Sequence, residues 1–269
     1  MTAATVQSDR FADTFRREAT LGNWVRDRNP ITVLVVLAAL AVMAVGIPGI
    51  VAPVAVSLVF VSIGFIGGVG RSFTLTFLKL WAVVGLLLFV LRAALIKGDT
   101  VLFTLGPIAV TQEGIVDGLR FSTVVMAICG AVTLFFALIP IKHLMLALEL
   151  RGLSPHASYV MLASFQAITD LGKTAKVVMD AQKARGIETE GSIAKRVKAF
   201  VPVLAPVFLS AMTATEERAI ALDARAFNSR IPHTQLVRMR ATPRWEWLVV
   251  GLAIVAAILS CIGGAVGWL

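Results

Sequence analysis

The chain has 269 residues, of which 58% are hydrophobic and 15% are charged, and its mean hydropathy is +0.85. Soluble domains carry about a quarter charged residues, so this composition excludes an ordinary soluble protein and indicates an integral membrane protein. The net charge of +9 favours cationic loops on the cytoplasmic side of a bilayer over nucleic-acid binding.

The first 29 residues are polar and contain a segment, 8–28, with five arginines. This segment is too long and too charged for the start of a signal peptide, and no small-residue cleavage site follows it. We therefore expect residues 1–29 to be a retained cytoplasmic leader, either an amphipathic surface helix or an irregular tail.

Apolar stretches in the remainder of the chain predict about five transmembrane helices. The expected spans are residues 31–45, 50–69, 73–96, 115–139 and 248–268. Residues 97–114 are expected to form a loop, because they contain Gly-Asp and Gly-Pro turn signals.

The distribution of charge predicts the orientation in the membrane. Residues 140–244 contain 15 lysines and arginines against 8 acidic residues, whereas the loop 97–114 has one lysine and two acids. Cytoplasmic segments are enriched in lysine and arginine. We therefore expect a multi-pass protein of the cell (inner) membrane with a cytoplasmic N-terminus.

Two long amphipathic helices are expected within residues 140–244. Ser154-Pro155 is a favourable helix start, and apolar residues then recur every three or four positions as far as Arg185. Ser192 is placed to cap a second helix that continues to about Ala226, with Pro202 and Pro206 bending or interrupting it. Residues 199–214 are apolar enough for a sixth span, but they are short, and we favour a buried or surface helix.

Each long helix ends in the same pattern, Ala-Arg followed by a small residue and then an apolar one. The first pattern is Ala184-Arg185-Gly186, and the second is Ala224-Arg225-Ala226. One such pattern is typical of an ordinary helix C-terminus. Two of them on neighbouring basic helices favour a pair of docking tips, because arginine at a helix end can bind carboxylates through two parallel hydrogen bonds.

No pattern in the sequence indicates catalysis. The two cysteines and three histidines lack the spacing of a metal site, so no metal or other cofactor is expected. Gly172-Lys173-Thr174 lacks the strand and first glycine of a phosphate-binding loop. Asp180 and Asp223 precede the tip arginines and are expected to form local helix ion pairs. The chain is therefore predicted not to be an enzyme.

Four segments together resemble the transmembrane T component of energy-coupling factor (ECF) transporters, which are modular ABC-type importers of vitamins and transition-metal ions. They are the paired Ala-Arg tips, Leu-Arg-Gly-Leu-Ser-Pro at 150–155, Phe-Val-Pro-Val-Leu at 200–204, and Asp-Arg-Asn-Pro at 27–30. The resemblance covers most of the chain and is strongest between residues 140 and 230.

The resemblance implies an all-α polytopic membrane protein with two long cytoplasmic coupling helices. Its partners would be two ABC-type ATPases, which hydrolyse the ATP, and a membrane S component, which binds the substrate. Ala184, Arg185 and Gly186 match the family's first docking motif, and Ala224 and Arg225 match the second, where Ala226 replaces the usual glycine. The S component is expected to contact an apolar surface of the coupling helices that includes Met161, Phe165, Leu204 and Phe208.

The predicted organisation is thus a leader (1–29), transmembrane helices 1–4 (30–139), a cytoplasmic coupling domain (140–244) and a C-terminal transmembrane helix (245–269). Two other functions are considered. A self-contained secondary transporter or channel would require ionisable groups deep in the spans, but the carboxylates lie at or near span ends. A membrane scaffold for an unrelated cytosolic complex would keep the basic helices and need no ATPases.

Overall fold

The computed structural model describes residues 17–18, 22–96, 100–105, 108–186, 192–229, 237–239 and 242–266. The chain divides into two compact units, which are considered separately below. The first unit is Met1–Arg151 together with Gln235–Leu269, and the second unit is Gly152–Thr234. The cytoplasmic location expected for residues 140–244 remains a prediction.

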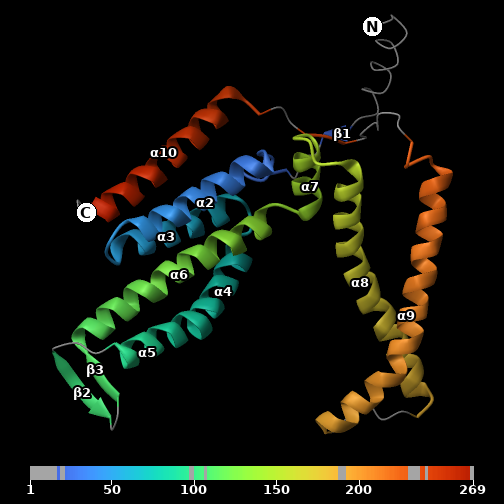
Figure 1. Cartoon of the computed structure of the whole chain (residues 1–269), viewed down its shortest axis with the longest axis horizontal. Coiled ribbons are helices and arrows are strands. Elements are labelled where there is room, and N and C mark those ends of the chain that lie inside the picture. Colours follow the sequence, from blue (N-terminus) through green and yellow to red (C-terminus); the bar gives the residue numbers. More distant parts are fainter. Residues whose placement is uncertain are drawn as a thin grey trace, which may run out of the picture. The chain divides into compact units, whose positions relative to one another are not determined.

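The first unit is a bundle of apolar helices, shown in Figure 1. Its helices are α2 (Pro30–Gly46), α3 (Val51–Ile66), α4 (Gly70–Leu80), the π-helical turn η1 (Trp81–Gly85), α5 (Leu86–Leu95), α6 (Gln112–Leu138), α7 (Ile141–Glu149) and α10 (Arg244–Val266). Two short strand pairs accompany them. β1 (Arg17–Glu18) lies parallel to β4 (Val237–Arg238), and β2 (Val101–Leu105) lies antiparallel to β3 (Ile108–Thr111).

Each of the five predicted spans corresponds to a helix or to a continuous run of helices. Within the described residues, three helical runs are long and apolar enough to cross a bilayer: 70–95, 112–138 and 244–264. Helices α2 and α3 are apolar but shorter. The chain is thus a helical membrane protein, as predicted, while the hairpin β2–β3 was not predicted within the loop 97–114.

Helix α6 forms the centre of the first unit. Half of the residues in its most apolar stretch are buried, compared with 6% in the corresponding stretch of the run 70–95 and 11% in that of α10. Its side chains pack against α2, α3 and α4 in a core that contains Leu37, Ala41, Ala44, Val56, Phe60, Phe73, Ala127, Ala131, Leu134, Phe135 and Leu138. The run 70–95 and α10 therefore expose most of their apolar surface, as expected for lipid-facing spans.

Helix α10, near the C-terminus, packs against α2, the first helix of the bundle, through small residues. A Cβ atom on Gly46 would lie 2.9 Å from the backbone of Ser260 and Cys261, and one on Gly264 would overlap the carbonyl group of Gly46. Small residues allow membrane helices to approach at the level of the backbone. The close contact between α2 and α10 therefore requires glycine at both positions.

A buried ion pair flanked by two exposed indoles holds the segment before α2 against the start of α10. The guanidinium group of Arg28 donates to Glu246 at 2.7 Å and lies 4.0 Å from the ring centres of both Trp24 and Trp245. The two indoles are nearly parallel, at 9°. The cluster combines this ion pair with two cation–π contacts, each worth about 0.5–1 kcal/mol at exposed rings.

The second unit consists of two long helices, α8 (Pro155–Ala184) and α9 (Ile193–Ala224). Their lengths, 30 and 32 residues, agree with the sequence prediction. Ser154 caps α8 as predicted by accepting from the amide of Ala157 at 3.2 Å, whereas Ser192 precedes α9 without a side-chain cap. Helix α9 continues through Pro202 and Pro206 and is visibly bent in Figure 1.

Candidate functional site

The two predicted tips lie at opposite ends of one antiparallel helix pair. His156 and Tyr159, in the first turns of α8, contact residues just beyond the end of α9. Further along, Asp170 of α8 pairs with Arg218 of α9 at 3.1 Å. Residues later in α8 therefore contact residues earlier in α9, so the two helices are antiparallel.

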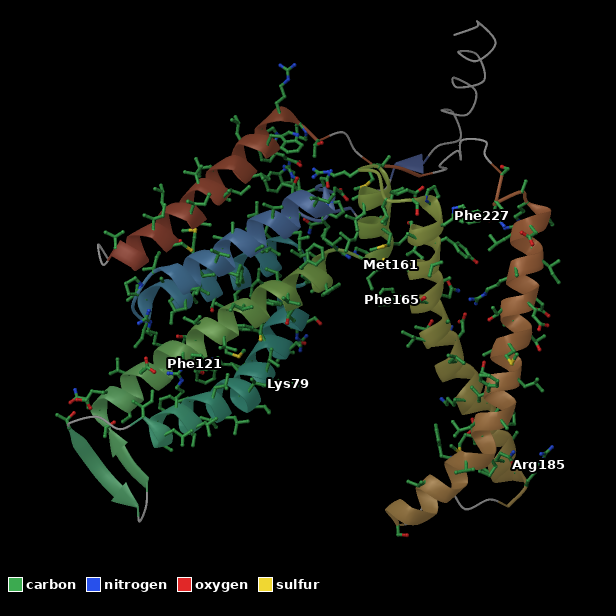
Figure 2. All side chains as sticks on the ribbon, viewed as in Figure 1. Lys79, Phe121, Met161, Phe165, Arg185 and Phe227 are labelled. Carbon is green, nitrogen blue, oxygen red and sulfur yellow. The ribbon has the colours of Figure 1, made fainter. Side chains whose placement is uncertain are left out.

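This arrangement separates the tips. The second tip (residues 224–226) is beside the start of α8, and the first tip (residues 184–186) is at the end of the same helix. Tyr159 and Arg185 are 26 residues apart, which is about 40 Å along a helix with a rise of about 1.5 Å per residue. Figure 2 shows Phe227, next to the second tip, and Arg185 at the two extremes of the pair.

The first tip ends α8 in a left-handed turn. Arg185 is the C-cap, with φ −86° and ψ 5°, and Gly186 follows with φ +86°. The amide of Gly186 donates to the carbonyl of Lys183 at 2.9 Å. Gly186 adopts this conformation without strain because it has no Cβ atom.

The second tip has the same backbone geometry although its last residue is alanine. Arg225 is the C-cap, with φ −91° and ψ 8°, and Ala226 follows with φ +54°. The amide of Ala226 donates to Asp223 at 2.9 Å, and the amide of Phe227 donates to Leu222 at 3.0 Å. These two hydrogen bonds make a complete Schellman motif. The left-handed position after the C-cap, which Ala226 occupies here, normally favours glycine.

An aromatic contact fixes the second tip against α8. The ring of Phe227 lies 4.9 Å from that of His156 and 5.3 Å from that of Tyr159, measured between centroids. The ring Nε2 of His156 lies 3.0 Å from Oδ1 of Asn228, whose amide nitrogen donates to Asp223 at 3.1 Å. We call these four residues, His156, Tyr159, Phe227 and Asn228, the brace.

The sequence did not predict the brace. In the sequence Phe227 is only the apolar residue that follows the second tip, and neither His156 nor Asn228 is part of a repeated motif. Their proximity depends on the antiparallel packing of two helices separated by the loop between them, for which the sequence pattern carries no signal.

All six tip residues are exposed in the structure. The side chains of Arg185 and Arg225 have no ion pair with any described residue, so both guanidinium groups are available to a partner. The expectation that Asp180 and Asp223 form local helix ion pairs is wrong, because neither residue has an ion pair with any described residue. Asp223 instead accepts from Asn228, and Asp180 is exposed without such a pair.

The four residues predicted to contact an S component are also accessible. Met161, Phe165, Leu204 and Phe208 expose 44%, 45%, 53% and 67% of their surface. The members of each pair are four residues apart, so each pair lies on one side of its helix. Figure 2 shows Met161 and Phe165 on the side of α8 facing away from α9. Exposed apolar stripes of this kind are typical of surfaces that bind a protein or a membrane.

The exposed arginines of the tips can form charge-assisted hydrogen bonds. Within the described part of the chain, no group of three or more histidine, cysteine, aspartate or glutamate side chains could hold a metal ion. Each tip carries an arginine at a helix end, and its guanidinium group can donate two parallel hydrogen bonds to a carboxylate of a partner.

Comparison with known proteins identifies the family. The family model described as cobalt transport protein, CbiQ, matches residues 22–236. The energy-coupling factor transporter transmembrane protein EcfT of Listeria innocua is 32% identical over 193 residues, which is 68% of this chain and 70% of that protein. The chain belongs to the family of ECF transporter transmembrane (T) components.

Two further relatives of this T component carry the same name. The EcfT protein of Bacillus subtilis is 32% identical over 200 residues, or 70% of this chain and 74% of its own. The EcfT protein of Thermosediminibacter oceani is 27% identical over 217 residues, or 77% and 81% of the two chains. The T component is therefore a membrane subunit of an ECF-type transporter, and the matched residues include both tips.

Proposed function

We propose that this T component couples two cytoplasmic ATPases to a substrate-binding S component through the helix pair α8–α9. The observation that carries the proposal is that two exposed arginines, Arg185 and Arg225, occupy equivalent positions at opposite ends of one helix pair. A separation of about 40 Å suits two separate subunits better than two contacts on one small protein.

The tips would dock in grooves on the ATPases. Ala184 and Ala224, the small residues before the arginines, keep each helix end narrow, and the left-handed residue that follows turns the chain away. Each arginine would then bind carboxylates of its ATPase with two hydrogen bonds. The non-catalytic T component leaves ATP hydrolysis to these partners.

The helix pair would transmit the motion. When ATP binding moves the two ATPases relative to one another, the tips move with them. The long helices carry the displacement to the apolar surface that Met161 and Phe165 form on α8 and that Leu204 and Phe208 form on α9, toward the other end of the pair. An S component held on that surface would be reoriented and would release a vitamin or a transition-metal ion into the cell. Flexible methionine and phenylalanine side chains suit a surface that holds such a partner.

Charge reversal at the tips tests this function. Arg185→Glu and Arg225→Glu should each weaken one ATPase contact by about 2–5 kcal/mol, and the double variant should release both ATPases. Co-purification of the complex and uptake in whole cells are the measurements. Lys176→Glu makes the same charge change at an exposed position of α8 away from the tips and should leave both readouts intact.

Three results would contradict the proposal. The first is unchanged ATPase co-purification and uptake in the double variant. The second is transport by the purified chain alone without nucleotide, which would indicate a secondary transporter or channel. The third is co-purification with a cytosolic complex that lacks ATPases, which would indicate a scaffold.

A further inference from the structure

Helix α4 carries an exposed polar face at the start of an otherwise apolar helical run. Arg71, Ser72, Thr76 and Lys79 are all exposed, and at about 100° per residue they fall within an arc of about 140°. On the other side of the helix, Phe73 is fully buried and stacks on Phe77. Helix α4 therefore packs through its aromatic side, and its outward side carries these four polar residues together with the exposed Leu75 and Leu78.

Two cations on this face have no partner among the described residues. Arg71 and Lys79 form no hydrogen bond or ion pair there, and Lys79 is at the edge of the bundle in Figure 2. By contrast, Arg26 donates to the carbonyl of Leu138 at 3.2 Å and Arg28 pairs with Glu246. Arg71 and Lys79 are eight residues apart, or about 12 Å along the helix.

The position of these cations relative to the bilayer follows from the length of the helix. The continuous run 70–95 has 26 residues, about six more than the roughly 20 that cross a hydrocarbon core. Exposed apolar residues begin with Leu75 and Leu78, at 51% and 60%, and continue beyond Lys79 with Val83 at 70%, Leu87 at 64% and Val90 at 54%. The hydrocarbon layer therefore begins at about residue 75 or 76, which places Arg71 among the headgroups, and the flexible stem of Lys79 can extend back to them.

We propose that the polar face of α4, with Arg71 and Lys79 as its cations, binds the phosphate groups of anionic phospholipids. Two cations about two helical turns apart match neighbouring headgroups, and the hydroxyls of Ser72 and Thr76 add polar contacts between them. Each cation near an anionic membrane surface strengthens association about fivefold. The inference is independent of ATPase docking, because it concerns only the first unit.

Spin-labelled lipids test the proposal on the full-length chain. The protein is reconstituted in phosphatidylcholine bilayers at low salt, and electron paramagnetic resonance measures how strongly labelled phosphatidylglycerol is preferred over labelled phosphatidylcholine at its surface. Arg71→Gln with Lys79→Gln should lower the preference, by at most about fivefold for each charge removed. Lys79→Arg should retain it, and Lys176→Gln, a matched charge change in the second unit, should not alter it.

Several outcomes would overturn the assignment. An unchanged phosphatidylglycerol preference in the double variant is one, and equal loss in Lys79→Arg is another. Displacement of the labelled lipid by millimolar glycerol phosphate would indicate a site for free phosphate. If lipid preference persists while a membrane protein partner no longer co-purifies, the face is a protein interface instead.

Discussion

Ala226 occupies the position after the second tip arginine that Gly186 occupies after the first, and both residues have left-handed backbones, with φ +54° and +86°. Among the described residues, Ala226 is the only one other than glycine with a positive φ. An L-residue in this conformation costs about 1–2 kcal/mol relative to glycine. The second tip therefore maintains the geometry of the first at an energetic cost, and its surroundings must hold it in place.

Replacing Ala226 by glycine should relieve this strain. We expect Ala226→Gly to stabilise the end of α9 by about 1 kcal/mol, which corresponds to about fivefold slower hydrogen exchange at the amides of residues 226 and 227. Gly186→Ala should produce the opposite change at the first tip. Ala224→Gly, a substitution inside the helix, should destabilise by about 0.5–1 kcal/mol. Faster exchange in Ala226→Gly would contradict the conformation described here.

The brace should hold the second tip and not the first. Phe227→Ala removes two aromatic contacts, each worth about 0.5–1.5 kcal/mol, and should weaken the proposed ATPase contact at Arg225. His156→Leu should act in the same direction, whereas His156→Gln keeps an N–H donor for Asn228 and should be milder. Site-specific cross-linking from each tip to the ATPases is the measurement. Equal losses at both tips would show that the brace stabilises the whole helix pair instead.

The helices could be predicted from the sequence because their signals are local. Apolar runs identified the spans, and the Ser154-Pro155 start together with the three-to-four-residue periodicity gave the 30-residue length of α8. The two tips were recognised because the same short pattern occurs twice. These features depend on neighbouring residues, so no tertiary information was needed.

The remaining features depend on contacts between distant residues. Arg28 and Glu246 are 218 positions apart, and nothing near either residue identifies the other. The same applies to the brace and to the pairing of Asp170 with Arg218, which crosses between helices. The ion pairs expected for Asp180 and Asp223 came from helical spacing alone, whereas Asn228, beyond the turn at the second tip, provides the actual donor to Asp223.

The contact between α2 and α10 predicts a strong effect of a single methyl group. Gly264→Ala would place a Cβ atom against the carbonyl of Gly46, so α10 must shift, and we expect a loss of about 1–3 kcal/mol. Gly251→Ala is a matched control in the same helix, because a Cβ atom there meets nothing within 4 Å. Thermal unfolding of the purified protein in detergent is the measurement. Similar midpoints for the two variants would contradict the close packing at Gly264.

The stability of the first unit should depend on pH through His143 in α7. Burial, followed by the nearby charges of Lys142 and Arg26, lowers the pKa of this histidine below its usual value of 6.5, while Asp27 opposes the shift. The unfolded chain therefore binds the proton more readily than the folded one. This contribution to stability is complete above about pH 6.5 and is lost as the pH falls below that value.

Unfolding midpoints measured between pH 5 and pH 7.5 should therefore fall toward the acidic end in the unmodified chain. His143→Gln has no group that titrates in this window, so its midpoint should vary less with pH over the same range. Lys142→Gln removes one of the repelling cations, so the fall in unfolding midpoint toward acidic pH should become smaller. It should not disappear, because burial is the larger cause of the lowered pKa. If the two variants and the unmodified chain show the same pH profile, His143 is not the group that makes the first unit acid-sensitive.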